Sequence, residues 1–289
     1  MKIVVLGCGA LGTVLASALS AAGHSVVVAC ADPVRARQIL AEGLRITVHG
    51  GEATARPAAV LLLAEQRRLH GDAAIVTLPA WVAEKALPMV EAEVVLVPQP
   101  SLRALEWGRP LAFYGCAWGA SPASYVAAEL RTSGEGEIVD ALRAASSVLG
   151  IRFYLHGDAR SLVWDYMGVN AAAQPAAAVL GVSYGKLSAT RHGRALVEAV
   201  AEEAWQVASE AGVKLWRGSR EAVQVLLGLR GCYPKMLRDL EEGRATEIDY
   251  INGALLREAL RYGIYTPYND ALYLAVKGLE EVMGVGGGN

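Results

Sequence analysis

Three glycines near the N-terminus have the spacing of a phosphate-binding turn. Gly7, Gly9 and Gly12 form a GxGxxG pattern between an apolar run at Ile3–Leu6 and a helical stretch at Leu11–Ala22. In such a pattern the first glycine allows a tight turn, the second lets the backbone approach a pyrophosphate, and the third packs helix against strand. The positive end of the helix then faces the phosphates. The predicted dinucleotide-binding loop consists of Gly7, Cys8, Gly9, Ala10, Leu11 and Gly12.

Charged residues follow the next apolar run, Ser25–Cys30, at the place where a dinucleotide's adenine ribose is normally bound. A carboxylate at Asp32 would accept hydrogen bonds from the ribose hydroxyls, which favours NAD(H) and repels the 2′-phosphate of NADP(H). Arg35 and Arg37 lie close behind it and would instead pair with that phosphate. A solvated, charged helix start explains all three residues as well. The sequence therefore leaves the choice between NAD(H) and NADP(H) open.

A stripe of polar side chains interrupts an otherwise apolar helical stretch in the second half of the chain. Tyr166, Asn170 and Gln174 are spaced by four residues, so they share one face of the predicted helix. Polar groups in apolar surroundings need partners, which are either a ligand or other buried polar groups. The stripe is therefore a candidate ligand-binding wall, and the alternative is a stripe that is satisfied within the protein.

Short β-branched runs alternate with helical stretches over the first half of the chain. This alternation predicts parallel strands joined by right-handed crossovers, and hence a doubly wound α/β sheet. The predicted strands are Ile3–Leu6, Ser25–Cys30, Ala59–Leu63, Ala74–Leu78, Val94–Val97, Leu111–Tyr114 and Ile151–Leu155, with helices at Leu11–Ala22, Val34–Glu42, Trp81–Val90 and Glu137–Leu149. After Asp158 the strand pattern stops, and helices are predicted at 158–180, 191–211, 218–229, 246–262 and 268–283. The predicted domains are a Rossmann-type α/β domain, residues 1–157, and an all-α domain, residues 158–289.

Composition excludes several classes of protein. Hydrophobic residues make up 53% of the chain and charged residues 19%, which is typical of an ordered globular protein. A formal net charge of −2 gives no basic patch, so nucleic acid is not an expected partner. No apolar run reaches the roughly 18 residues of a membrane span, and the N-terminal run enters the glycine turn without a basic leader. We expect a cytoplasmic protein with no membrane partner.

The four cysteines lack the spacing of a metal site. Cys8, Cys30, Cys116 and Cys232 are far apart, with no CxxC pair and no histidines at ligand spacing. We predict buried, reduced thiols and no metal.

Four motifs together resemble the ketopantoate reductase (2-dehydropantoate 2-reductase) family. They are GCGALG at 7–12, GCAWGA at 115–120, W-x-x-x-x-V-N at 164–170 and TEIDYINGALL at 246–256, so the resemblance covers nearly the whole chain. Members of that family use NADPH to reduce ketopantoate to pantoate, on the route to pantothenate and coenzyme A. The resemblance implies a Rossmann domain followed by a helical domain, an active site between them, and a possible homodimer.

The resemblance also assigns roles to individual residues. Glu247 matches the family's essential glutamate, which binds the substrate through a hydroxyl group. From the sequence alone, Glu247 is an acidic residue in the first turn of a helix capped by Thr246 and Asp249. The other matching polar positions are Asn170, Glu203, Asp239 and Asn252.

Several family positions are occupied by different residues here. Tyr166 replaces the catalytic lysine, Gln174 replaces a second asparagine, and Lys235 replaces a serine that helps to bind the substrate carboxylate. In the cofactor domain, an arginine is replaced by Ala31, a lysine by Pro79, and the usual NG pair by Gln99-Pro100. A tyrosine titrates near pH 10, so a nearby cation would improve it as a proton donor. We hypothesise that the ammonium group has moved to Lys235, where it either protonates the alkoxide or pairs with the carboxylate; the alternative is a solvated lysine at a helix start.

These observations predict an NAD(P)H-dependent reductase of a small 2-oxo acid, with ketopantoate as the first substrate to test. The alternatives are a diverged dehydrogenase for another 2-oxo or 2-hydroxy acid, and a non-catalytic dinucleotide-binding protein. NADP(H) is the cofactor that the resemblance implies, and NAD(H) is the alternative. The predicted site residues are Tyr166, Lys235 and Glu247 for catalysis, Asn170, Gln174, Glu203 and Asn252 for substrate, and Gly7 to Gly12, Asp32, Arg35 and Gln99 for cofactor.

Overall fold

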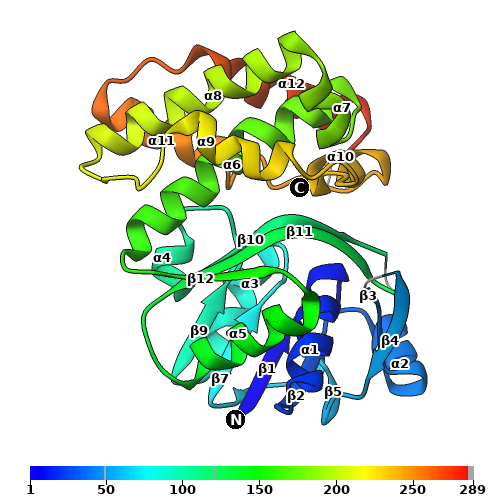
Figure 1. Ribbon diagram of the computed structural model, residues 1–289. Coiled ribbons are helices and arrows are strands. Elements are labelled where there is room, and N and C mark those ends of the chain that lie inside the picture. Colours follow the sequence, from blue (N-terminus) through cyan, green and yellow to red (C-terminus); the bar gives the residue numbers. More distant parts are fainter. Residues whose placement is uncertain (49, 120, 286–289) are drawn as a thin grey trace. The chain divides into compact units, whose positions relative to one another are not determined.

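The computed structural model describes residues 1–48, 50–119 and 121–285. The chain divides into two compact units. The first consists of Met1–Gln99, Ala104–Phe113 and Ala117–Ala159, and the second of Pro100–Arg103, Tyr114–Cys116 and Arg160–Asn289. The predicted fold class, a Rossmann-type α/β sheet followed by an all-helical domain, is confirmed (Figure 1). Ala120, the last residue of the GCAWGA motif, lies outside the described residues.

Eight strands form the main sheet, in the order β12-β11-β10-β9-β7-β1-β2-β5. Their bounds are β1 Lys2–Leu6, β2 Ser25–Cys30, β5 Ala59–Leu62, β7 Ala73–Val76, β9 Val94–Val97, β10 Arg109–Trp118, β11 Ser124–Ser133 and β12 Arg152–His156. Strand β1 pairs in parallel with β2 and β7, so that Ile3 lies opposite Val26 and Ala73. The parallel pairing continues to β5 beyond β2 and through β9 to β10 beyond β7, as the alternating pattern predicted.

Helices bury both faces of the parallel strands, which explains why β1 is apolar from Ile3 to Leu6. Ile3 and Val5 belong to a core with α1 (Ala10–Ala21) and α5 (Glu137–Leu149), which pack side by side (Figure 1). Val4 and Leu6 belong to another core with α3 (Ala80–Ala86). A parallel strand covered on two faces has no polar side, and β-branched residues suit it.

Several elements were not predicted. A hairpin of β3 (Leu44–Val48) and β4 (Gly51–Ala55) follows α2 (Pro33–Glu42), and strand β11 was missed entirely. The smaller elements are η1 Leu63–Glu65, β6 Leu69–His70, η2 Leu87–Met89, β8 Val90–Glu91 and α4 Ala104–Trp107. The helix predicted over Trp81–Val90 ends at Ala86, because Pro88 lacks the N–H that an α-helix would need there.

The second unit contains seven helices among its described residues. They are α6 Ala159–Leu180, α7 Tyr184–Ala189, α8 Arg191–Glu210, α9 Ser219–Leu227, α10 Lys235–Glu241, α11 Asn252–Tyr262 and α12 Pro267–Val282. Met167 of α6, Val207 of α8, Leu255 of α11 and Val276 of α12 share one buried core. Among the described helices, none combines the length and apolar character that crossing a membrane requires.

The helix predicted over 246–262 begins only at Asn252, and the capping box predicted for Thr246 and Asp249 is wrong. The Thr246 hydroxyl accepts a hydrogen bond from the Ile248 N–H, and the side chain of Asp249 contacts Tyr273 and Lys277 of α12. Residues 246–251 form a turn instead.

The prediction of four reduced thiols is also wrong. Cys8 forms a disulfide with Cys30, and Cys116 with Cys232; their Cα atoms are 5.2 and 5.4 Å apart, which is normal for this bond. Each disulfide lies within one unit. The first joins the glycine loop after β1 to the end of the neighbouring strand β2, and the second joins residues 116 positions apart. Neither pair has a local spacing that the sequence could reveal.

Candidate active site

The glycine loop has the backbone that a dinucleotide site requires. Gly7 adopts a φ of +106°, and its N–H donates to the Ala29 carbonyl at 2.9 Å. A Cβ at Gly7 would lie 2.7 Å from the Thr77 hydroxyl, and a Cβ at Gly12 would collide with the Gly7 carbonyl. At Gly9 a Cβ would meet nothing within 4 Å, so this residue faces open space at the N-terminus of α1. The loop therefore fits a pyrophosphate that approaches at Gly9.

Three polar side chains support this loop from behind. The Thr77 hydroxyl lies 3.0 Å from the carbonyl oxygens of both Leu6 and Gly7. The Cys8 carbonyl accepts from the Arg35 Nε at 3.2 Å, and the Thr13 hydroxyl accepts from the same guanidinium at 3.1 Å. Thr77 was missed by the sequence reasoning. Its position directly after β7, the strand next to β1, was the available signal, because strand ends meet at the ligand-binding edge.

The structure separates the roles of Asp32 and Arg35. Asp32 is exposed at the N-terminus of α2, where one carboxylate oxygen accepts from the Val34 N–H at 2.8 Å. The Arg35 guanidinium is buried against the loop and also donates to Gln38. Burial lowers the pKa of Arg35, and the nearby carboxylates of Glu42 and Asp32 only partly offset this effect. Arg35 is thus part of the loop's scaffold, whereas Asp32 can present a second carboxylate oxygen to a ribose.

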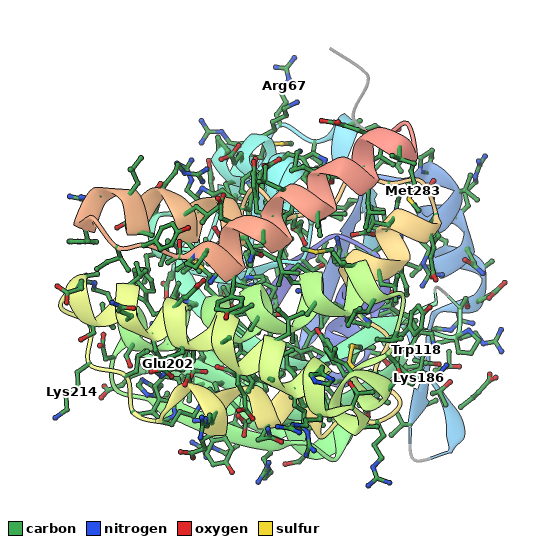
Figure 2. All side chains as sticks on the ribbon, turned by 90° about the horizontal axis from the view of Figure 1, so that it is seen from above. Arg67, Trp118, Lys186, Glu202, Lys214 and Met283 are labelled. Atoms are coloured by element: carbon green, nitrogen blue, oxygen red, sulfur yellow. A yellow bond between two sulfur atoms is a disulfide. The ribbon has the colours of Figure 1, made fainter. Side chains whose placement is uncertain are left out.

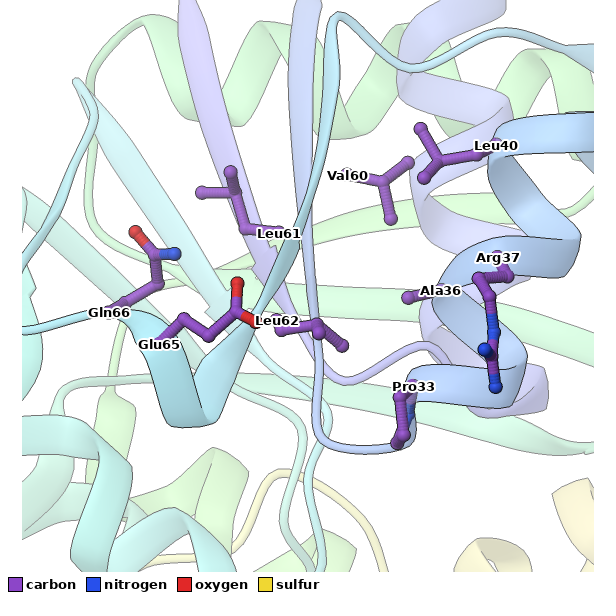
Figure 3. Close-up of a pocket in the computed structure, with 9 residues that line it drawn as sticks. All are labelled: Pro33, Ala36, Arg37, Leu40, Val60, Leu61, Leu62, Glu65 and Gln66. Carbon is purple, nitrogen blue, oxygen red and sulfur yellow. The ribbon is translucent and has the colours of Figure 1, made fainter.

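A pocket lies beside α2 and the edge strand β5 (Figure 3). Its lining residues are Pro33, Ala36, Arg37, Leu40, Val60, Leu61, Leu62, Glu65 and Gln66. Arg37 is on its wall, and none of the lining residues belongs to the glycine loop. Gln99, which was also predicted to bind cofactor, is buried and donates to the Leu78 carbonyl at 2.5 Å, so it joins the segments that follow β9 and β7.

In the helical unit, the polar stripe of α6 forms a chain of hydrogen bonds. Asn170 donates to the Tyr166 carbonyl at 2.7 Å and accepts from Gln174 at 2.8 Å. The Gln174 oxygen then accepts from the Met236 N–H at 3.3 Å, at the start of α10. The alternative that this stripe is satisfied within the protein therefore holds for these groups. The same bonds bring Asn170 and Gln174 next to the helix that carries Lys235.

Lys235 is the centre of a charged cluster. Its Nζ lies 2.6 Å from an Asp239 carboxylate oxygen and 3.2 Å from Oε2 of Glu247. The other oxygen of Asp239 accepts from Arg244 at 2.9 and 3.1 Å. Both acidic side chains are almost buried, whereas that of Lys235 is 44% exposed. Burial lowers the pKa of Lys235, but the charges of Glu247 and Asp239 outweigh it and raise the pKa above its ordinary value. Lys235 is therefore a persistent cation that reaches solvent.

Tyr166 is in different surroundings. Its side chain is 8% exposed, and its ring makes an edge-to-face contact with Tyr114 at 5.2 Å between centroids. It also lies near Tyr184, whose pKa is raised first by burial and then by the neighbouring Tyr166. Tyr166 is thus part of an aromatic group, whereas the contacts of Lys235 are with carboxylates.

The structure does not bring Glu203 and Asn252 to this cluster. The Glu203 carboxylate accepts from the backbone N–H groups of Tyr268 and Asn269, both at 2.9 Å, in the first turn of α12. The side chain of Asn269 donates to Glu203 at 2.7 Å. Asn252 is fully buried and donates to the Ala171 carbonyl and to Asn269. These contacts give both residues a role in joining α6, α8, α11 and α12.

No group of three or more histidine, cysteine, aspartate and glutamate side chains in the described part of the chain is arranged to bind a metal ion.

Comparisons with known proteins agree with this organisation. Residues 3–97 match the family model Ketopantoate reductase PanE/ApbA, and residues 158–280 match its counterpart, Ketopantoate reductase PanE/ApbA C terminal. A 2-dehydropantoate 2-reductase from Archaeoglobus fulgidus is 28% identical, over 96% of this chain and 98% of the relative.

Two solved structures show the same fold over nearly the whole chain. D-mandelate dehydrogenase with NADH and anilino(oxo)acetate has a TM-score of 0.85 at 22% identity, covering 99% of this chain and all of the other. A PanE/ApbA family ketopantoate reductase from Ralstonia eutropha JMP134 has a TM-score of 0.82 at 23% identity, covering 98% of this chain and 100% of the other.

Proposed function

The chain belongs to the ketopantoate reductase family, and we propose that it reduces a small 2-oxo acid with NADH. The observation that carries the proposal is the pairing of Lys235 with Glu247 at 3.2 Å in the helical unit. Lys235 begins the helix that is bonded to Gln174. A cation and a carboxylate side by side suit a substrate that carries both a carboxylate or ketone oxygen and a hydroxyl group. Ketopantoate has these groups, and the resemblance assigns the hydroxyl to Glu247.

In this proposal Lys235 takes over the role of the missing family lysine. A bound nicotinamide would supply the hydride that adds to the carbonyl carbon. The ammonium of Lys235 donates a hydrogen bond to the carbonyl oxygen and gives a proton to the alkoxide that develops there. Asp239, itself bonded to Arg244, holds the ammonium in place. Asn170 and Gln174 fix the start of α10.

The preference for NADH rests on three positions of the first unit. Asp32 is exposed after β2 and would bind the ribose hydroxyls, while its charge disfavours a 2′-phosphate. Arg35 already donates to Cys8, Thr13 and Gln38. Pro79 offers no cation where the family has a lysine. Cys8 to Leu11 would bind the pyrophosphate through their backbone.

An aryl 2-oxo acid is a second candidate substrate. Tyr166 brings an aromatic ring, in contact with Tyr114, to the position where the family has its lysine. D-mandelate dehydrogenase, whose fold this chain shares, was solved with the aromatic oxo acid derivative anilino(oxo)acetate.

The test measures loss of nicotinamide absorbance with purified protein, NADH or NADPH, and either ketopantoate or phenylglyoxylate. The proposal is supported if ketopantoate is turned over faster with NADH than with NADPH, and faster than phenylglyoxylate is turned over with NADH. A preference for phenylglyoxylate would favour the second candidate. Tight NADH binding without turnover of any 2-oxo acid would support a binding protein instead. A role in pantothenate synthesis stays a prediction, and so does the homodimer. Sedimentation of the purified protein tests the homodimer.

A further inference from the structure

Glu247 is carried by a short turn between two helices. Residues 246–251 lie between α10 and α11 and belong to neither helix. The Tyr250 and Ile251 N–H groups both donate to the Glu247 carbonyl, at 3.0 and 3.1 Å. The Ile248 N–H donates to the Thr246 hydroxyl at 3.3 Å. A functional side chain needs its backbone fixed to within a fraction of an ångström, so the contacts between this turn and the neighbouring helix are decisive. These contacts are made with helix α12.

The N-terminal end of the turn is bonded to helix α12. Oε1 of Glu280 accepts from both the N–H and the hydroxyl of Thr246, each at 2.8 Å. Glu280 is only 5% exposed, and Thr246 is buried to the same extent. A buried carboxylate with two donors from one residue fixes that residue firmly, because either bond is costly to lose in this environment.

The other side of Glu247 is bonded to the same face of α12. Asp249 accepts from the Tyr273 hydroxyl at 2.7 Å and from Lys277 Nζ at 3.1 Å, and Lys277 also lies 2.8 Å from Oε2 of Glu280. Burial lowers the pKa of Lys277, but its bonds to Glu280 and Asp249 outweigh this and raise the pKa. The ammonium therefore links the two anchors at neutral pH.

We propose that Tyr273, Lys277 and Glu280 are positioning residues that hold Glu247 for the substrate. They contact Thr246, directly before Glu247, and Asp249, two residues after it, so they act through the turn. Their spacing of four and three places them on one face of α12. The inference rests on the proposed function, since it gives Glu247 a substrate contact, but the state of the turn can be measured without turnover.

The first experiment measures amide hydrogen exchange in Lys277→Met and Glu280→Gln. Both variants should speed exchange of the Tyr250 and Ile251 amides while exchange in α8 is unchanged. Glu281→Gln is the matched control, because it removes the same charge from an exposed neighbour on the same helix. Lys277→Arg should restore slow exchange. Unchanged exchange of these amides in both test variants overturns the inference, and this holds even if the protein turns over no 2-oxo acid and the proposed function itself fails.

The second experiment is a double-mutant cycle with Glu247→Gln. We expect Lys277→Met to raise the KM for the 2-oxo acid about five- to tenfold with little change in the KM for NADH, because a misplaced Glu247 weakens substrate binding only. In the Glu247→Gln background the same substitution should have no further effect. If the wild-type enzyme turns over and Lys277→Met changes the KM for the 2-oxo acid equally in the wild-type and Glu247→Gln backgrounds, Lys277 has a merely structural role. That result would overturn the proposal.

Discussion

At the scale of single residues, the proposed chemistry depends most on the charge of Lys235. Lys235→Met should lower kcat/KM for the 2-oxo acid about 10- to 150-fold, since a hydrogen bond to a charged group contributes about 1.5–3 kcal/mol. Lys235→Arg should keep part of the activity, because the charge remains. Lys214→Met is the control: Lys214 is exposed and extends away from the helices (Figure 2). Steady-state kinetics of the three variants checks this, and an active Lys235→Met enzyme would contradict the assignment.

The pH profile tests the same residue independently. Because the pKa of Lys235 is raised, the ammonium stays protonated up to and into the pH range in which an ordinary lysine titrates. The proton is lost only as pH rises through the raised value. Reduction should therefore show no decline caused by Lys235 up to about pH 10. The stability that the ion pairs contribute follows the same sign, being complete at neutral pH and lost only at higher pH. A decline centred between about pH 8 and 9 that disappears in Lys235→Arg would contradict this prediction.

Asp32 gives a second prediction at the residue scale. Asp32→Asn keeps an acceptor for the Val34 N–H, so the start of α2 should survive, but the charge is removed. The ratio of kcat/KM for NADH to that for NADPH should fall by about tenfold or more, equivalent to about 1.4 kcal/mol. Arg37→Met, in the pocket beside α2, tests whether a cation there supports NADPH use by the variant. An unchanged ratio in Asp32→Asn would remove the basis for an NADH preference.

At the scale of elements, Glu203 is expected to stabilise the start of α12 and not to bind substrate. Glu203→Ala leaves two backbone N–H groups and the Asn269 amide without their acceptor. The free energy of unfolding should fall by about 2–3 kcal/mol, because these bonds are charge-assisted and lie at a helix N-terminus. The KM for the 2-oxo acid should be unchanged in the folded variant. Denaturant unfolding and kinetics, with the exposed Glu210→Ala as control, separate the two roles; a large rise in KM without loss of stability would favour substrate binding.

The elements also show what the sequence could and could not predict. Ser25–Cys30 and Val94–Val97 were predicted at their observed bounds, because strands buried on both faces are continuous apolar runs. The β3–β4 hairpin was missed although Gly50-Gly51 was an available turn signal. Acidic residues near Thr246 suggested a helix start. Instead, the N–H and hydroxyl groups of Thr246 donate to Glu280, 34 positions away. Similarly, the partners of Glu203 and Arg35 come from distant segments, so their roles needed the fold.

At the scale of the whole molecule, the two disulfides should act on different units. In the chain-entropy model, closing the 116-residue separation of Cys116–Cys232 is worth about 4–5 kcal/mol and the 22-residue separation of Cys8–Cys30 about 3 kcal/mol. Cys116 and Cys232 belong to the second unit, and Cys8 and Cys30 to the first. Replacing each pair by alanine should therefore destabilise its own unit.

The measurement that separates them combines denaturant unfolding with NADH binding. The alanine pair at 116 and 232 should lower the unfolding transition of the helical unit and leave NADH affinity unchanged. The pair at 8 and 30 should weaken NADH binding, because Cys8 lies in the glycine loop and its carbonyl is an acceptor for Arg35. Peptide mapping of the unreduced protein must first find both bonds. Four titratable thiols in the unfolded, unreduced protein would mean that the cysteines are reduced. Neither loop would then be closed, and neither alanine pair should show the predicted loss of stability.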